Sequence, residues 1–196
     1  MSRLSVNLNK FALLRNSRDT NYPDLMTMAS RAISCGVHGI TVHPRPDQRH
    51  TRYSDVRDLS RLTSNEPRVE FNVEGNPTPT FLEIVEETRP DQCTLVPDTP
   101  DQLTSNRGWD VEACRDFLEP LIRRLQRAGI RVSLFVEPIL SQLETAKSIG
   151  ADRIELYTEP YARAYREKQI DEIWNCFNRA AIHACAIGLG VNAGHD

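Results

Sequence analysis

One pattern recurs five times along the chain: a helical run ends, usually beside a glycine, and a β-branched strand begins within a few residues. It reads AISCGVHGITVH, VEETRPDQCTLV, LQRAGIRVSLFV, AKSIGADRIELYT and HACAIGLGVNAGH. Glycine just past a helix accepts the left-handed C-cap conformation that other residues resist, and Pro90 ends the helix where the glycine is missing. The pattern therefore predicts helices and strands that alternate throughout the chain.

Alternating strands and helices indicate a parallel sheet with right-handed crossovers. The predicted strands are Leu4–Leu8, Gly39–Val42, Arg68–Val73, Gln92–Val96, Arg131–Val136, Arg153–Tyr157 and Gly190–Ala193. An open doubly wound sheet normally has a glycine-rich phosphate loop after its first strand. The first predicted strand is followed instead by NLNKFALLRNSRD, which contains no glycine. We therefore predict an α/β fold of the TIM (β/α)8 barrel type.

Local signals also place several helix starts. Pro23 suits an early helix position, where its missing N–H costs nothing. Ser54 is expected to cap the run DVRDLSRL, and Thr78 or Thr80 the run FLEIVEETR. Residues 165–188 have their apolar side chains at helical spacing and are predicted to form one amphipathic helix.

The composition favours one globular domain and argues against a nucleic-acid or membrane partner. The 196 residues are 39% apolar and 26% charged, with a formal net charge of −3, and no basic tail stands out. No apolar run approaches the about 20 residues of a spanning helix, and the first residues lack the apolar block of a signal peptide. The five cysteines form no C-x-x-C pair, which predicts reduced thiols in a cytoplasmic protein without a zinc or redox motif.

The polar residues of the predicted strands collect at one end. In a barrel of this type the active site lies at the carboxyl ends of the strands. The polar residues at or just after those ends are Asn7, Asn9, Lys10, His43, Arg45, Asn72, Glu74, Asp98, Thr104, Ser105, Glu137, Glu155, Tyr157, Asn192 and His195. The opposite ends carry Arg68, Arg131 and Arg153 instead. Because the ionisable proton carriers gather at one end, we predict an active site there.

Each of these residues, taken singly, has a plainer interpretation. A lone histidine at a strand end is more often a hydrogen-bonded surface residue than a catalyst, and Glu74 beside a glycine is compatible with simple solvation. For Glu137 we prefer the role of a cap for the next helix. Glu155, in the middle of DRIELYT, would be buried and must be either paired or functional.

Two features near the ends of the first two predicted strands sharpen the prediction. Asn7 and Asn9 alternate with apolar residues, so both are expected to point into the mouth of the barrel. Arg45, Arg49 and His50 follow the second strand in a loop that suits an anionic ligand, because the planar guanidinium matches phosphate or carboxylate.

Seven stretches together resemble the pyridoxine 5′-phosphate synthase family, which closes the ring in one route to vitamin B6. They are VNLNKFALLRNSR, GITVHPRPDQRH, FNVEGNPT, TLVPDTPDQLTSNRGWD, RVSLFVEP, RIELYTEPYA and GVNAGHD. They follow the family's order and cover essentially the whole chain. The combination is specific, although no single stretch is.

The resemblance implies a (β/α)8 barrel that forms homo-oligomers, commonly octamers, and that uses no metal or organic cofactor. Its substrates would be 1-deoxy-D-xylulose 5-phosphate and 3-amino-2-oxopropyl phosphate. By motif, His43 and Glu74 resemble the proton acceptors, His195 the proton donor, and Glu155 the carboxylate that stabilises the transition state. The positions that resemble substrate-binding residues are Asn7, Asn9, Lys10, Arg18, Arg45, His50, Thr104 and Asp196.

The chain departs from the family in two respects. Many members carry Asp-His where this sequence has Asn9-Lys10, which leaves the role of Lys10 open. The family also continues with one more strand and helix and with phosphate-binding backbone. The resemblance therefore predicts a single barrel domain over residues 1–196 that lacks the last strand–helix unit of the family.

The implied chemistry accounts for the residue types. Imine formation, loss of water, loss of phosphate and ring closure all move protons at different points of one bound intermediate, so several acids and bases are needed. Two rival functions remain. One is a metal-dependent sugar-phosphate isomerase or hydrolase with ligands His43, Glu74, Glu155 and His195, although no H-x-H pair occurs. The other is a truncated barrel that binds ligand without turnover.

Overall fold

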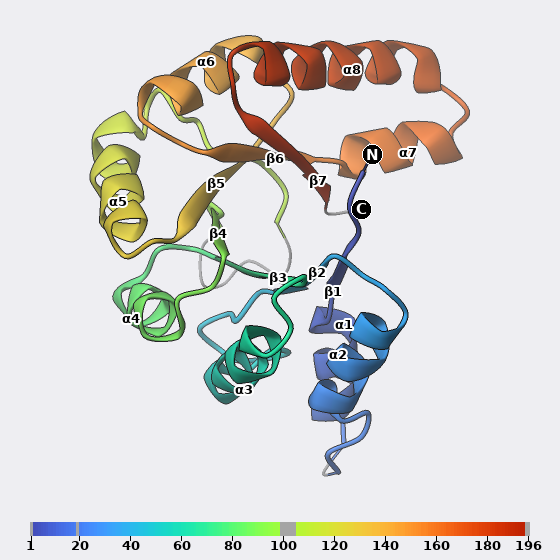
Figure 1. The fold of residues 1–196 in the computed structure, drawn as a ribbon. Coiled ribbons are helices and arrows are strands. Elements are labelled where there is room, and N and C mark those ends of the chain that lie inside the picture. The colour runs from blue at the N-terminus through green and yellow to red at the C-terminus, as the bar shows by residue number, and fades with distance from the viewer. Residues whose placement is uncertain (1, 19, 99–104, 195–196) are drawn as a thin grey trace. The chain divides into compact units, whose positions relative to one another are not determined.

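The computed structural model describes residues 2–18, 20–98 and 105–194 (Figure 1). The chain forms two compact units. The N-terminal unit runs to Cys93 and includes Ala128–Ile130, and the C-terminal unit holds the rest of the chain. The described residues contain seven strands whose order in the sheet follows the chain, β1-β2-β3-β4-β5-β6-β7. This order is the one that successive crossovers produce, and it confirms the predicted α/β class.

The elements have the following bounds. Strands β1 to β7 are Ser5–Asn7, Gly39–Val42, Glu70–Gly75, Gln92–Leu95, Arg131–Val136, Arg153–Tyr157 and Gly190–Gly194. Helices α1 to α8 are Asn9–Asn16, Leu25–Ser34, Tyr53–Ser64, Pro79–Thr88, Arg115–Arg127, Leu140–Ser148, Glu159–Arg166 and Ile170–Ala186. The predicted strands are confirmed with ends that differ by no more than about two residues, the usual uncertainty of such boundaries.

Parallel pairing fixes the register within each unit. In the N-terminal unit Ile40 pairs with Phe71 and Val42 with Val73, and all four side chains are buried in the apolar core. In the C-terminal unit the apolar residues of β5 and β6 pair in the same way. The alternate positions of β2, β3 and β6 point to the other face of the sheet and carry polar side chains. That second face therefore carries Thr41, Asn72 and Glu74 in the N-terminal unit and Glu155 in the C-terminal unit.

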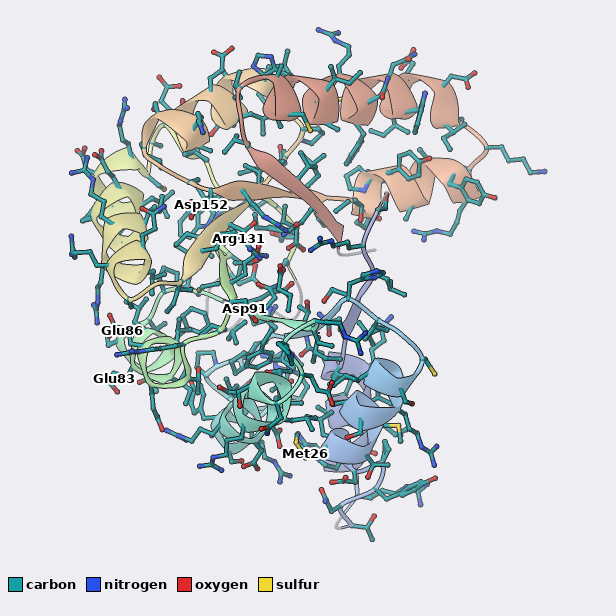
Figure 2. The ribbon with its side chains drawn as sticks, viewed as in Figure 1. Met26, Glu83, Glu86, Asp91, Arg131 and Asp152 are labelled. Carbon is teal, nitrogen blue, oxygen red and sulfur yellow. The ribbon has the colours of Figure 1, made fainter. Side chains whose placement is uncertain are left out.

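One aspartate lies just before β4 and another just before β6, and each accepts a hydrogen bond from the strand that precedes it in the chain. Asp91 accepts a hydrogen bond from the backbone N–H of Phe71 at 2.8 Å, and Asp152 accepts one from Val132 at 2.8 Å. Both aspartates are labelled in Figure 2. Because each carboxylate satisfies the N–H of the second residue of a strand, it fixes where that strand begins.

Some predicted helix starts are wrong. Helix α2 begins at Leu25 rather than at Pro23, because Asp24 is its N-cap and accepts from Thr27 N at 2.8 Å. Ser54 lies inside α3, whose N-cap is Arg52. The prediction of Thr78 as a cap is confirmed, since its hydroxyl accepts from a backbone N–H of α4.

Two further predictions in the C-terminal unit are wrong. The single helix expected over residues 165–188 is divided, because α7 ends at Arg166 and Lys168 adopts a left-handed φ of 59° before α8 begins. Glu137 does not cap α6, whose N-cap is Ile139 without a side-chain hydrogen bond. Among the described residues, no helix is long and apolar enough to cross a membrane.

Candidate active site

The carboxyl ends of β2 and β3 bring two of the predicted acid–base residues to the same level. Thr41 pairs with Asn72 and Val42 with Val73; His43 comes directly after β2, and Glu74 is the next residue of β3. Both follow the alternation of Thr41 and Asn72, so both lie on the polar face. The His43 residue is 7% exposed, while Glu74 is half-buried.

Asn9 ties the end of β1 to this pair. Its side-chain oxygen accepts from the backbone N–H of His43 at 2.9 Å and from the hydroxyl of Thr51 at 2.9 Å. Asn9 lies just after the predicted first strand and is the first residue of α1. The side chain of Asn7 accepts from the backbone N–H of Asn9 at 2.9 Å, at the first residue of α1.

The segment that follows β2 carries a cationic side chain and an imidazole. Arg45 is 5% exposed, and the rings of His43 and His50 lie with their centres 6.2 Å apart in an edge-on arrangement. Burial, followed by the charge of Arg45, lowers the pKa of His50 to about 4. Thr51 N donates to Nδ1 of His50 at 2.9 Å. The neutral ring therefore carries its proton on Nε2, where it can donate to a ligand.

A row of buried polar side chains runs beneath Glu74. Gln92 Nε2 donates to the side-chain oxygen of Asn72 at 3.2 Å, which orients the amide so that Nδ2 faces Thr41 and Glu74, each at 3.4 Å. The Thr41 hydroxyl lies 2.7 Å from that of Ser5. Of this row, the sequence prediction included only Asn72 and Glu74, because the others lie deeper along their strands than the ends on which it relied.

The C-terminal unit holds the buried carboxyl that the sequence predicted. Glu155 is 7% exposed, and burial raises its pKa to about 7, with a hydrogen bond to Thr94 acting in the opposite direction. Gly194 leaves room for it, since a Cβ there would lie 2.7 Å from Glu155 Oε1. At neutral pH this carboxyl can therefore give or take a proton.

The loop after β4 is anchored within the C-terminal unit. Ser105 donates to Oδ2 of Asp98 at 2.6 Å, and both are buried. Trp109 Nε1 donates to the carbonyl of Leu95 at 2.9 Å. Thr104, His195 and Asp196, which the resemblance assigned to the site, lie outside the described residues.

The remaining predicted residues are on the surface of the N-terminal unit. Lys10 is exposed in the first turn of α1, and Arg18 is exposed just after this helix ends. Asn7 is also exposed. Among residues 2–18, 20–98 and 105–194, no three histidine, cysteine, aspartate or glutamate side chains are grouped so as to hold a metal ion.

Comparison with solved structures defines the class of fold. HMG-CoA lyase from Brucella melitensis matches all of this chain and 81% of its own with a TM-score of 0.60 at 12% identity. Deoxyribose phosphate aldolase from Aeropyrum pernix matches 98% of this chain and 84% of its own, with a TM-score of 0.53 at 13% identity. These likenesses confirm an α/β fold of the TIM-barrel type and say nothing about the reaction.

Sequence comparison gives the family. Residues 4–196 match the family described as pyridoxal phosphate biosynthesis protein PdxJ, and the chain belongs to this family. It is 48% identical to pyridoxine 5′-phosphate synthase from Cytophaga hutchinsonii and 50% identical to that from Porphyromonas gingivalis. A synthase of the same name from Brucella abortus is 48% identical. Each match covers the whole of this chain and 80% of the relative.

Proposed function

We propose that this protein is a pyridoxine 5′-phosphate synthase. It condenses 1-deoxy-D-xylulose 5-phosphate with 3-amino-2-oxopropyl phosphate and releases pyridoxine 5′-phosphate, inorganic phosphate and water. The observation that carries the proposal is that His43 follows β2 directly and Glu74 lies near the end of the adjacent β3, with the buried Arg45 and the half-buried His50 in the segment after β2. The family and the names of the relatives at 48–50% identity support the same reaction.

The residues after β2 suit a phosphate ester. Arg45 supplies a permanent charge and a planar fork of donors. His50 is neutral near pH 7 because of its low pKa, and it adds one directed N–H from Nε2. Arg45 is buried and His50 is half-buried, so both bind an anion more strongly than fully exposed donors would, because less water competes. We assign these two residues to one substrate phosphate.

The catalytic assignments follow the family motifs. His43 and Glu74 are assigned as proton acceptors, and Glu155 is assigned as the carboxylate that stabilises the transition state. The pKa of about 7 suits Glu155 to this role, because it changes its charge with little cost near neutral pH. His195 is assigned as the proton donor by motif. Each positioned acid or base contributes roughly 10²–10⁴ to the rate.

The other assignments follow the resemblance. The side chain of Asn9 accepts hydrogen bonds from the backbone of His43 and the hydroxyl of Thr51. We therefore assign it two roles, contact with substrate and support of these two residues. Asn7, Lys10, Arg18, Thr104 and Asp196 complete the proposed binding residues. A homo-oligomer, an octamer by resemblance, and a cytoplasmic location are further proposals; light scattering after size exclusion tests the first.

Product formation tests the function directly. The protein is mixed with both substrates in metal-free buffer, and pyridoxine 5′-phosphate is measured by mass. Glu74→Gln is expected to lower the rate by at least about 10²-fold, because it removes a base and keeps the shape. Glu83→Gln is the matched control, since Glu83 is exposed on α4 and is expected to leave the rate unchanged (Figure 2).

The same assay separates the rival functions. Turnover that requires added divalent metal would favour the metal-dependent isomerase or hydrolase. Substrate binding by calorimetry without any product would favour a barrel that only binds. Equal rates for Glu74→Gln and the parent would contradict the acid–base assignment even if product forms.

A further inference from the structure

The segment 45–51, called here the cradle segment, has to be held in place to bind a ligand well. It carries Arg45 and His50, and it leaves the sheet at His43 without forming a helix or strand of its own. Gln48 within it adopts a left-handed φ of 51°, which costs a residue other than glycine of the order of 1 kcal/mol. A segment with such a residue keeps its shape only if its surroundings fix it.

The side-chain amide of Asn16 makes the closest tie. Its Nδ2 lies 2.6 Å from the carbonyl oxygen of His50, 3.2 Å from that of Arg49 and 3.3 Å from that of Gln48. An amide nitrogen has only two N–H groups, so at least one of them is shared between carbonyls. Three successive carbonyls of the cradle segment thus converge on one donor from the end of α1.

A buried ion pair orients this amide. Arg15 donates from Nε to the side-chain oxygen of Asn16 at 3.1 Å, which settles which end of the amide faces the carbonyls. The other two nitrogens of Arg15 bind the carboxylate of Asp55 at 2.7 and 2.8 Å. The side chains of Arg15 and Asp55 are only 4% and 11% exposed, so the fork is rigid and little screened.

The same ion pair reaches the far end of the segment. Asp55 Oδ2 also accepts from the backbone N–H of Arg52 at 2.8 Å, and Arg15 Nη2 donates to the carbonyl of His50 at 3.3 Å. The backbone of the cradle segment is therefore tied to α1 and to the first turn of α3 through Arg15, Asn16 and Asp55, which we call the loop clamp.

We propose that the loop clamp consists of positioning residues for substrate binding, which act by holding the cradle segment in its ligand-binding shape. The inference rests on the proposed function, because it assigns the phosphate ester to Arg45 and His50. It adds residues that lie outside the proposed substrate-binding set and that the sequence patterns did not single out. Because the clamp orders the cradle segment before substrate binds, binding does not have to supply that conformational entropy. Loss of the clamp therefore weakens substrate binding more than it slows the chemical steps.

The test uses Asn16→Ala, which removes the donor to the three carbonyls and leaves the buried ion pair of Arg15 and Asp55 in place. The matched control is Asn65→Ala. Asn65 also donates from Nδ2 to a backbone carbonyl, that of Arg61 at 2.8 Å, but at the end of α3. Steady-state kinetics and thermal melting are measured on both variants and on the parent.

Asn16→Ala is expected to raise KM for one phosphorylated substrate at least tenfold and to change kcat less than threefold. Asn65→Ala is expected to leave both parameters unchanged. If Asn16→Ala lowers the melting temperature but leaves KM unchanged, Asn16 contributes only to stability, and the proposal is overturned. Equal loss in both variants would overturn it as well, because the effect would not be specific to the cradle segment.

A readout without turnover keeps this test separate from that of the proposed function. The His50 imidazole is titrated by NMR in the parent and in Asn16→Ala, with His50→Gln used to assign its signal. Release of the segment to water is expected to move the pKa of His50 upward from about 4 toward its usual 6.5. An unmoved titration overturns the clamp even if the enzyme is active. A parent without turnover refutes the proposed function, and the shift then still tests the clamp.

Discussion

The buried carboxyl of Glu155 predicts that one substitution will stabilise the protein and disable it. Glu155→Gln replaces the carboxyl by a neutral amide of nearly the same shape. Burial raises the pKa of Glu155 to about 7 from an ordinary value of 4.5. The folded protein therefore holds a proton there at pH values where the unfolded chain has already lost it, and the free energy of unfolding falls as pH rises through this window.

The size of the effect follows from the two pKa values. They differ by about 2.5 (about 7 less 4.5), and each pKa unit corresponds to 1.36 kcal/mol, so ionisation of the buried group costs about 3 kcal/mol by pH 8. The amide never ionises and avoids this cost. Relative to the parent, Glu155→Gln should be about 3 kcal/mol more stable at pH 8 and nearly equal at pH 4.5.

The assay is denaturant unfolding of both proteins at several pH values between 4.5 and 8. The comparison must be variant against parent, because His50 titrates in the same range with the opposite sign. Its pKa is lowered to about 4, so its contribution makes the protein less stable as pH falls through 6.5, and this contribution cancels in the difference. Turnover at pH 7 should fall by about 10²-fold in the same variant.

A stability difference that does not change with pH would refute this reasoning, since it would mean that Glu155 does not titrate between 4.5 and 7. Gly194→Ala provides an independent probe of the same carboxyl. Its Cβ would lie 2.7 Å from Glu155 Oε1, so the carboxyl must move. We expect turnover to fall about tenfold while stability changes by less than about 1 kcal/mol, because a side-chain end can shift cheaply.

Three further predictions concern stability and reactivity. Gly75→Ala should lower the free energy of unfolding by about 2 kcal/mol, because the new methyl would lie 2.3 Å from the Phe81 ring; an unchanged denaturation midpoint would contradict this. Asp55→Asn should cost about 3 kcal/mol, because it leaves the buried charge of Arg15 without its partner; equal stability in urea would refute it. Cys93, whose thiol pKa burial raises, should be alkylated at least about 100-fold more slowly than the exposed thiols in the native protein, and equal labelling by mass would exclude its burial.

The strands could be predicted from the sequence because their signals are local. A glycine that ends a helix and a β-branched run that follows it lie within a dozen residues, and both act on the backbone directly. Gly39–Val42 and Arg153–Tyr157 have the predicted bounds for this reason. The polar side chains that share one face of the sheet could also be predicted from the sequence, because alternation along a strand fixes which side chains lie on the same face.

The start of α3 and the loop clamp depend on distant residues and could not be predicted, whereas the Thr78 cap of α4 is local and could. Ser54 looks like a good cap locally, but α3 begins at Tyr53 because Asp55 accepts the N–H of Arg52. That carboxylate is itself held by Arg15, 40 residues earlier in the chain. Contacts between residues this far apart in the chain do not affect the local sequence pattern, so they can be recognised only in the folded structure.

Burial acts on Glu155 and His50 in the same physical sense and with different consequences. In both it disfavours the charged form, which raises the carboxyl pKa to about 7 and lowers the imidazole pKa to about 4. Near neutral pH the carboxyl is therefore poised to exchange protons, while the imidazole is fixed as neutral. In the proposed site, His50 then contributes a hydrogen bond to the phosphate but no charge, and Arg45 supplies the charge. For this reason we keep Glu155 among the proposed catalytic residues and His50 among the proposed binding residues.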